Sequence, residues 1–485
     1  MQPTAKKTSL PKSAHLANVA LFAGLLSGCG GNVAPVTPPP VSQPAPQLYM
    51  SPFVAGTTNG GNSFLGSSDT QTYTFDDVGG AFQQTTYVLS PPAQQGAQVI
   101  NAGPLAATTE RGLLNLTVAI NYNPTPNGLI VTHPALTGGL ALELAGQAGG
   151  LVQLPGQPVA PLVAADACPV NTKPQTYQFV TIPLWLPTAT TVTAGDPSWD
   201  PATDTAYGSV DVTASGTSVN FANIRHFTLA GAAVTGTAAN PVPSSIAGAC
   251  GPTQYGNTIS IPGQIVVTDP NPNPGGTSAP QGIVGIGPSG LLVEDNGLAA
   301  VATYQNALGA GTGAIGLPKP AGPLDTGSLT GAQYMGFVYG GGVFSRVLSS
   351  SPSGWSSHLA SFGFPGSPAL PSACSSFAAQ TGPLVNGIYG GDFPQLNGRD
   401  NPSASANGFG NCDLAIDLGT QDTANNGLYP NATVWMGESY VANVSMTTRS
   451  FPAVAIAGQL QGKVAIFLLG KDATQPWAIY LLSTN

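Results

Sequence analysis

Apolar and polar residues alternate one by one along much of this chain, and glycines and prolines interrupt the alternation repeatedly. The clearest run covers nine residues and has apolar side chains at every second position: Leu114, Leu116, Val118, Ile120 and Tyr122. A period of two places all of them on one face of a β-strand. The chain also contains 63 glycines and 46 prolines, which favour turns and shorten helices. The pattern predicts a mainly β, antiparallel protein.

Three further segments have the pattern of β-hairpins, in which two alternating runs flank a turn: residues 210–221, 258–268 and 453–469. The predicted turns are, in the same order, residues 214–217, Pro262-Gly263 and Gln461-Gly462. Residues 478–482 supply one more strand at the C-terminus. Because no repeat of fixed period occurs, we expect two sandwich-like or barrel-like halves. A single propeller-like β architecture is the alternative.

The first 28 residues have the three regions of a bacterial signal peptide. Lys6, Lys7 and Lys12 form a positive region, and residues 16–26 are apolar but too few to span a bilayer. The apolar run ends in Leu26-Ser27-Gly28-Cys29, which looks like a lipobox. We therefore expect cleavage before Cys29, attachment of lipid to its thiol, and an outer-membrane location in the cell envelope.

Composition divides the rest of the chain. Residues 29–48 are rich in proline and uncharged, as expected of a semi-rigid spacer. The remainder is longer than the roughly 250–300 residues that one core usually accommodates. The proline- and glycine-rich residues 269–280 predict a linker between two β-rich domains, residues 49–268 and 281–485.

Charge limits the classes of partner. Charged residues make up 7% of the chain, against about 25% in ordinary soluble domains, and the formal net charge is −9. The few Lys and Arg residues are scattered, whereas nucleic-acid binding requires clustered basic groups that neutralise phosphates. The sequence favours a protein or glycan partner, attachment to a membrane through the lipid alone, and no nucleic acid or cofactor.

Four cysteines follow the lipobox: Cys168, Cys250, Cys374 and Cys412. An even number in an oxidising compartment predicts two disulfides. Of the three pairings, we favour Cys168–Cys250 with Cys374–Cys412, because each bridge then stays within one half of the chain. The absence of a Cys-x-x-Cys pair and of histidines nearby in sequence argues against zinc.

Three segments resemble an uncharacterised family of proteobacterial lipoproteins: residues 176–183 (TYQFVTIP), 285–295 (GIGPSGLLVED) and 475–480 (QPWAIY). The resemblance extends over most of the chain after the signal. It implies an envelope lipoprotein and no particular activity.

Two aspartates are the strongest candidates for catalysis. Asp325-Thr326-Gly327-Ser328 matches the loop of aspartic proteases, in which two carboxyl groups share a proton. A looser match surrounds Asp417, so an Asp325/Asp417 pair defines an alternative function as a secreted hydrolase. Pro323 and Leu418 depart from the protease pattern, and plain turns are the competing explanation. We favour a non-enzymatic protein.

Other candidate sites are weaker. Trp199 and Trp355 lie in polar, turn-rich segments, where an exposed indole can stack on a sugar or anchor a partner. Trp185, Trp435 and Trp477 lie in apolar runs and are expected in the core. The histidines that follow the signal, His133, His226 and His358, are expected to be structural or on the surface. The aspartates of residues 196–204 and 413–422 lack the close spacing of a calcium loop, so no metal is predicted.

Overall fold

The computed structural model spans residues 1–485, and the chain divides into two compact units, Met1–Pro44 and Ala45–Asn485. The structure describes β-strands between residues 47 and 483. Side chains are described mainly in these ranges: 174–182, 205–235, 243–251, 284–293, 313–338, 381–390, 414–435, 450–471 and 477–483. Signal, lipobox and most of the spacer lie outside the described residues. In the described part, no helix is long and apolar enough to cross a membrane.

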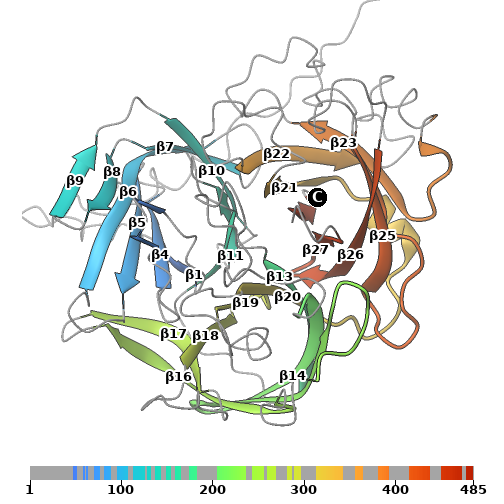
Figure 1. Ribbon diagram of the computed structural model, residues 1–485, viewed down its shortest axis with the longest axis horizontal. Helices are drawn as coiled ribbons and strands as arrows, with labels where there is room; N and C mark the ends of the chain where they lie inside the picture. Colours follow the sequence, from blue (N-terminus) through green and yellow to red (C-terminus); the bar gives the residue numbers. More distant parts are fainter. Residues whose placement is uncertain are drawn as a thin grey trace, which may run out of the picture. The chain divides into compact units, whose positions relative to one another are not determined.

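The first sheet of the larger unit has ten strands, all antiparallel, in the order β5-β4-β1-β12-β11-β10-β7-β6-β8-β9, and β5 also pairs with β6 (Figure 1). Its strands are β1 (Gln47–Ser51), β4 (Thr70–Asp76), β5 (Ala81–Val88), β6 (Gly96–Ala107), β7 (Leu113–Val118), β8 (Ile120–Thr125), β9 (Gly128–Thr132), β10 (Thr137–Glu143), β11 (Gly149–Gln153) and β12 (Ala160–Ala164). A separate two-stranded ribbon consists of β2 (Thr58–Asn59) and β3 (Asn62–Ser63).

The next eight strands form a closed antiparallel barrel, here called the first barrel. They are β13 (Gln175–Ile182), β14 (Tyr207–Ser215), β15 (Ser218–Phe227), β16 (Ile246–Tyr255), β17 (Ile259–Thr268), β18 (Gln281–Ile286), β19 (Leu292–Asp295) and β20 (Gly313–Pro318). Pairing of β13 with β20 closes the ladder, so that no strand is left as an edge.

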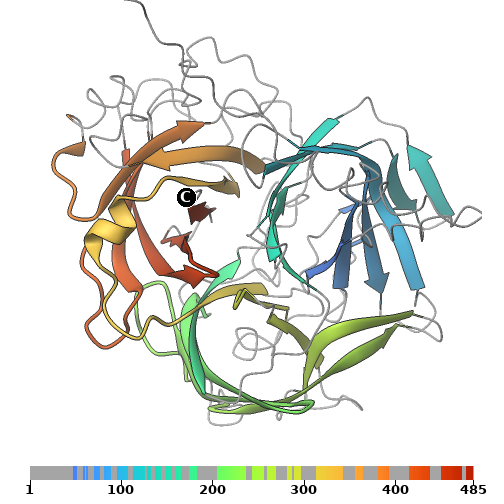
Figure 2. The same ribbon diagram turned by 180° about the vertical axis from the view of Figure 1, so that it is seen from behind.

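The last eight strands form the second barrel, which β21 and β28 close. They are β21 (Tyr334–Gly341), β22 (Trp355–Gly363), β23 (Gly387–Asp392), β24 (Leu414–Asp417), β25 (Leu428–Met436), β26 (Arg449–Leu460), β27 (Lys463–Gly470) and β28 (Trp477–Ser483). Figure 2 shows the short helix α1 (Thr326–Thr330) on the segment that leads into β21.

The mainly β, antiparallel prediction is confirmed, and two barrels close completely rather than forming blades of a propeller, although their bounds, residues 175–318 and 334–483, differ from those of the two expected halves. The hairpins at residues 210–221 and 453–469 are confirmed too. In the second of these, Gln461 (φ 49°) and Gly462 (φ 81°) both have positive φ, as a type I′ turn requires. The strand at 478–482 is confirmed as part of β28.

Two predicted elements differ from the structure. Residues 258–268 do not form a hairpin around Pro262-Gly263, because β17 runs without a turn and pairs with β16 and β18 instead. Residues 114–122 belong to two strands, β7 and β8, which both pair with β6 and have β10 and β9, respectively, as their other neighbours. Alternation continues through the break between β7 and β8, so it does not reveal where one strand ends and another begins.

The strand pairing also differs from the domain boundary expected at residues 269–280. β17 ends at Thr268 and β18 begins at Gln281, and the two pair as antiparallel neighbours in the first barrel. The segment therefore connects two strands of one sheet. Proline and glycine are typical of both linkers and hairpin loops, so composition alone does not distinguish the two.

Each barrel encloses its own core. Tyr177, Phe179 and Phe221 are among the buried side chains of the first barrel, and Tyr334, Trp477 and Leu481 are among those of the second. Strands β26, β27 and β28 are buried on their outer face as well: Phe467 and Tyr480, which alternate with inner residues, are fully buried in edge-to-face contact. Burial on both faces explains why these strands read as nearly continuous apolar runs.

Close packing between β20 and β26 requires a glycine. A Cβ atom at Gly458 would lie 3.0 Å from the carbonyl oxygen of Pro318 and 3.1 Å from the Cβ of Leu317. The outer surface of the first barrel therefore packs directly on the second at this point.

Candidate functional site

Asp417, the last residue of β24, holds a turn with its carboxylate. Its Oδ1 accepts hydrogen bonds from the backbone N–H groups of Asn386 (3.2 Å) and Gly419 (2.9 Å), and its Oδ2 accepts one from Val385 (3.1 Å). The side chain of Asn386 completes the arrangement by donating from Nδ2 to the Gly419 carbonyl oxygen at 2.6 Å. Gly419 has a φ of 69°, a left-handed conformation that favours glycine.

Asp325 lies at the start of a helix. It directly precedes α1, and its carbonyl oxygen accepts the first helical hydrogen bond, from Leu329 at 3.2 Å. Its Oδ2 lies 3.1 Å from the point where a Cβ of Gly327 would be, over the first turn. An aspartate in this position accepts hydrogen bonds from N–H groups that the helix leaves unpaired. The D-T-G-S residues at this position thus suit a helix start as well as a protease loop.

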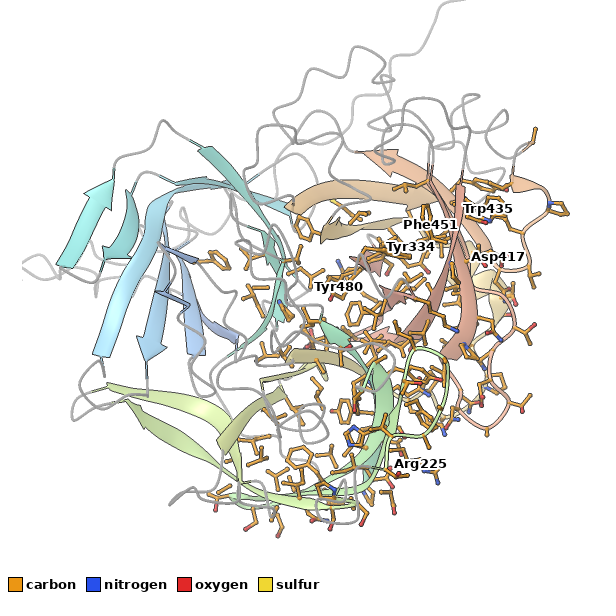
Figure 3. All side chains as sticks on the ribbon, in the orientation of Figure 1. Arg225, Tyr334, Asp417, Trp435, Phe451 and Tyr480 are labelled. Atoms are coloured by element: carbon orange, nitrogen blue, oxygen red, sulfur yellow. The ribbon has the colours of Figure 1, made fainter. Side chains whose placement is uncertain are left out.

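The structure brings the two segments near each other without joining the two carboxylates. The backbone N–H of Leu324 donates to Oε1 of Gln421 at 3.1 Å, and the Tyr429 hydroxyl donates to the same oxygen at 3.2 Å. The hydrogen bonds of Asp417, by contrast, all come from backbone N–H groups rather than from Asp325. The Asp417 carboxylate therefore holds its own turn, and the geometry lends no support to a proton shared with Asp325. Figure 3 labels Asp417 at the outer side of the second barrel.

The neighbouring loop, residues 421–427, is also held by its own polar groups. Oδ1 of Asp422 accepts from the backbone N–H groups of Ala424 and Asn425, both at 2.8 Å. Lys319 donates from Nζ to the Ala424 carbonyl at 2.9 Å, and Asn426 donates to the Pro320 carbonyl at 3.3 Å. The loop thus ties the segment after β20 to the second barrel. No cluster of three or more metal-ligating side chains occurs in the described part of the chain.

His226 is the most unusual polar group among the described residues. It lies inside the first barrel with 3% of its surface exposed, and its Nδ1 is 3.0 Å from Oγ1 of Thr205. Phe179 contacts the imidazole edge-on, with ring centroids 6.1 Å apart. Nε2 is buried and makes no hydrogen bond to any described residue. Burial lowers the pKa of His226 to about 4, so the ring is neutral at neutral pH.

A β-bulge explains why sequence alternation misses this inward position. Val219 and Phe221 point inward, so strict alternation would place Arg225 inside and His226 outside. Between Ser209 and Asp211 of β14 the register shifts, because β15 has an extra residue there. Asn223 has a φ of 51° at this point, and asparagine tolerates that conformation better than most residues. Arg225 is consequently exposed on the outer side of the barrel (Figure 3).

The remaining predicted site residues fall into two groups. Trp477 is fully buried as expected, whereas Trp435 is only half-buried. Trp185 and Trp199 lie outside the described residues. Of Trp355, at the start of β22, only the backbone is described. Cys250, on β16, is buried and disulfide-bonded. Cys168, Cys374 and Cys412 lie outside the described residues, so the pairing stays a prediction.

Comparison with known proteins identifies no family. No protein-family model and no curated protein matches the chain. Among solved structures, a weak similarity is to intact Ap-TbpB with its N and C lobes: 9% identity, 90% of this chain and 75% of that chain covered, and a TM-score of 0.22. What the structure itself defines is a mainly β protein built from two closed antiparallel barrels and a ten-stranded sheet.

Proposed function

We propose that this protein is a lipid-anchored lipoprotein of the bacterial cell envelope, located at the outer membrane, with a binding or structural role. One observation carries the anchor: the apolar residues 16–26 end directly in Leu26-Ser27-Gly28-Cys29. The resemblance of residues 176–183, 285–295 and 475–480 to proteobacterial lipoproteins supports the same assignment. Stable anchoring needs more than one acyl chain, and lipidation of this type supplies two or three.

The architecture of the folded part suits a binding or structural role. Closed barrels have no unpaired strand edge, so they present loops and outer faces without risking uncontrolled strand addition. Of the two candidates for catalysis, Asp417 accepts hydrogen bonds from backbone N–H groups of its own turn, and Asp325 directly precedes a helix. The composition of the proline-rich residues 29–48 is that expected of a semi-rigid spacer between the lipid and the folded part.

Metabolic labelling with a palmitate analogue tests the anchor. The wild-type protein should incorporate label and fractionate with the outer membrane. Cys29→Ser should remove the label and leave the precursor uncut by the lipoprotein signal peptidase. A matched control, Ser27→Ala, keeps a small residue before the cleavage site and should retain both. Label on the serine variant would contradict the proposal.

Binding is tested separately with the soluble chain from Leu48 onward. We expect this chain to capture a protein from envelope extracts or a glycan from an array. Alanine substitution of Trp199 and Trp355 should weaken the capture if the indoles contact the partner. Arg225→Ala, which changes an exposed residue of β15, is the control and should bind normally. Unchanged binding by both tryptophan variants would remove them from the site.

A further inference from the structure

His226 lies at a position that a charged imidazole cannot occupy without a change in structure. In the neutral ring, one nitrogen bonds Thr205 and the other, Nε2, is buried without a partner among the described residues. Protonation makes both nitrogens donors. Thr205 Oγ1 can accept from Nδ1, but the N–H at Nε2 would then carry buried charge with no described acceptor, an arrangement that is strongly unfavourable.

The groups that face His226 are uncharged in the described part of the barrel. Phe179 and Thr181 of β13 alternate on the inward face, Thr205 precedes β14, and Thr228 follows β15. Thr181 and Thr228 are both buried, and their hydroxyls already have local partners: Thr181 donates to the Ala206 carbonyl, and Thr228 accepts from the Ala232 N–H. Neither hydroxyl is a hydrogen-bond partner of the imidazole.

Titratable groups on the neighbouring elements are few. Arg225 is exposed on the outer face, and the Tyr207 ring stacks on Phe227 with centroids 5.3 Å apart. Burial, and then the charge of Asp422, raises the pKa of Tyr207, so this phenol is neutral throughout the acid range. On β19, Glu294 is in register with Ala314, which is in register with Thr181. Two further acidic residues belong to this ladder: Asp295 of β19, and Asp211 of β14, whose carboxylate accepts hydrogen bonds from Thr176 and Asn223. Glu294, on the same register line as Thr181, is the one that a test must include.

A short turn follows β15 directly and is fastened to His226 itself. The backbone N–H of Val234 donates to the His226 carbonyl at 2.9 Å, and Phe227 forms an isolated bridge with Ala233. Within the turn, residues 230–233 are exposed, and Gly231 has a φ of 85°. Apart from the contacts with His226 and Phe227, the hydrogen bonds of the turn lie within residues 228–232, so its displacement breaks no pairing between strands of the barrel.

We propose that protonation of His226 releases the turn of residues 228–234 and opens this end of the first barrel to water. The barrel end then acts as an acid-sensitive switch, closed at neutral pH and open in mild acid. The pKa of the folded-state imidazole is below its ordinary value, so the closed state is fully stable above about pH 6.5 and loses stability as the pH falls toward 4. This inference does not depend on the anchor or on the proposed function.

Amide hydrogen exchange on the full mature chain tests the switch. After correction for the intrinsic pH dependence of exchange, the opening constant of residues 228–234 should rise roughly 20-fold between pH 7 and pH 5, from a folded pKa of about 4 and an open-state pKa of 6.5. Strand β27 of the second barrel is the internal reference and should show no such rise. An equal rise in β27 would indicate global unfolding and overturn the proposal.

Variants assign the effect to one residue. His226→Gln should abolish the pH dependence of the turn, while His358→Gln and Glu294→Gln should retain it. Loss of the effect in Glu294→Gln would assign the proton to that carboxyl instead and contradict the proposal. If His226→Gln does not fold, NMR titration of the wild-type protein labelled at histidine replaces it. Comparison with His133→Gln and His358→Gln assigns the other two histidine resonances. The remaining resonance belongs to His226 and should titrate well below pH 6.5. Titration at the ordinary value would overturn the switch.

Discussion

Asn386 and Asp417 hold one turn of the second barrel between them. The Asn386 backbone N–H donates to Oδ1 of Asp417 at 3.2 Å, and the Asn386 side chain donates to the carbonyl oxygen of Gly419 at 2.6 Å. The carboxylate that the sequence offers as half of a catalytic pair is thus an acceptor for backbone groups between β23 and β24. If Asp417 is structural, replacing it should lower the stability of the fold. If it is catalytic, replacing it should abolish activity and leave stability unchanged, so measuring both tests the assignment.

Asp417→Ala should lower the free energy of unfolding by about 1–3 kcal/mol, because it leaves backbone N–H groups without their acceptor. Asp325→Ala removes a helix cap and should lower it by about 1 kcal/mol. Urea denaturation at neutral pH measures both. Asp417→Asn is the matched control: it keeps one carbonyl acceptor and should be intermediate. Acid protease activity lost in parallel in both alanine variants, with stability unchanged, would instead favour the hydrolase alternative.

Gly336 is predicted to be essential for closing the second barrel. It lies on β21 opposite β28, and a Cβ there would collide with the carbonyl oxygen of Tyr480. Gly336→Val should therefore push apart the two strands that close the ladder and destabilise the protein by about 3 kcal/mol, the upper end for overpacked interiors. Thermal unfolding measures the loss. Gly322→Ala, where nothing lies within 4 Å of the new Cβ, should be neutral; equal effects would contradict the closure argument.

Buried tyrosines should make the protein sensitive to alkali. Burial raises the pKa of Tyr177 and of Tyr429 to about 12, from an unfolded value of 10.0. Burial, and then Tyr429, also raises the pKa of Tyr334, whose hydroxyl donates to the Leu329 carbonyl at 2.5 Å. Because the neutral phenol is favoured in the folded state, its contribution to stability is complete below pH 10 and is lost as the pH rises through about 12.

Ultraviolet titration of phenolate absorbance measures this behaviour. Part of the signal from the 14 tyrosines should appear late and in one cooperative step with unfolding. Tyr177→Phe should reduce the amplitude of that late step. In urea the same titration should show a single transition near pH 10. A late step of unchanged amplitude in Tyr177→Phe would mean that this phenol is accessible in the folded state.

Cleavage within residues 269–280 should leave the two fragments associated. The strands on either side of the segment, β17 and β18, pair with each other in one barrel, so a nick opens a loop and breaks no ladder. Limited proteolysis followed by size-exclusion chromatography should show both fragments eluting together until urea is added. Fragments that separate in native buffer would indicate two independent domains, as the composition of the segment suggested.

The strands and the hairpin turns could be predicted from local sequence. The alternation at residues 210–221 and the Gln461-Gly462 turn predicted hairpins that the structure contains, because side-chain period and turn conformation depend on neighbours in sequence. The role of the candidate site residues could not be predicted in the same way. The D-T-G-S match at Asp325 is a set of residue types that suits a catalytic loop and a helix cap equally well, and only hydrogen-bond partners distinguish them.

By itself the sequence determined a β-rich, charge-poor chain with an N-terminal segment that looks like a lipobox, since these follow from residue types and short spacings. Only the tertiary structure decided that the strands close into two barrels, that residues 269–280 join paired strands, and that the bulge at Asn223 turns His226 inward. Barrel closure depends on pairing between strands far apart in the chain, such as β13 with β20. The side to which His226 points depends on a one-residue register shift, and a shift of one residue reverses every side chain that follows it.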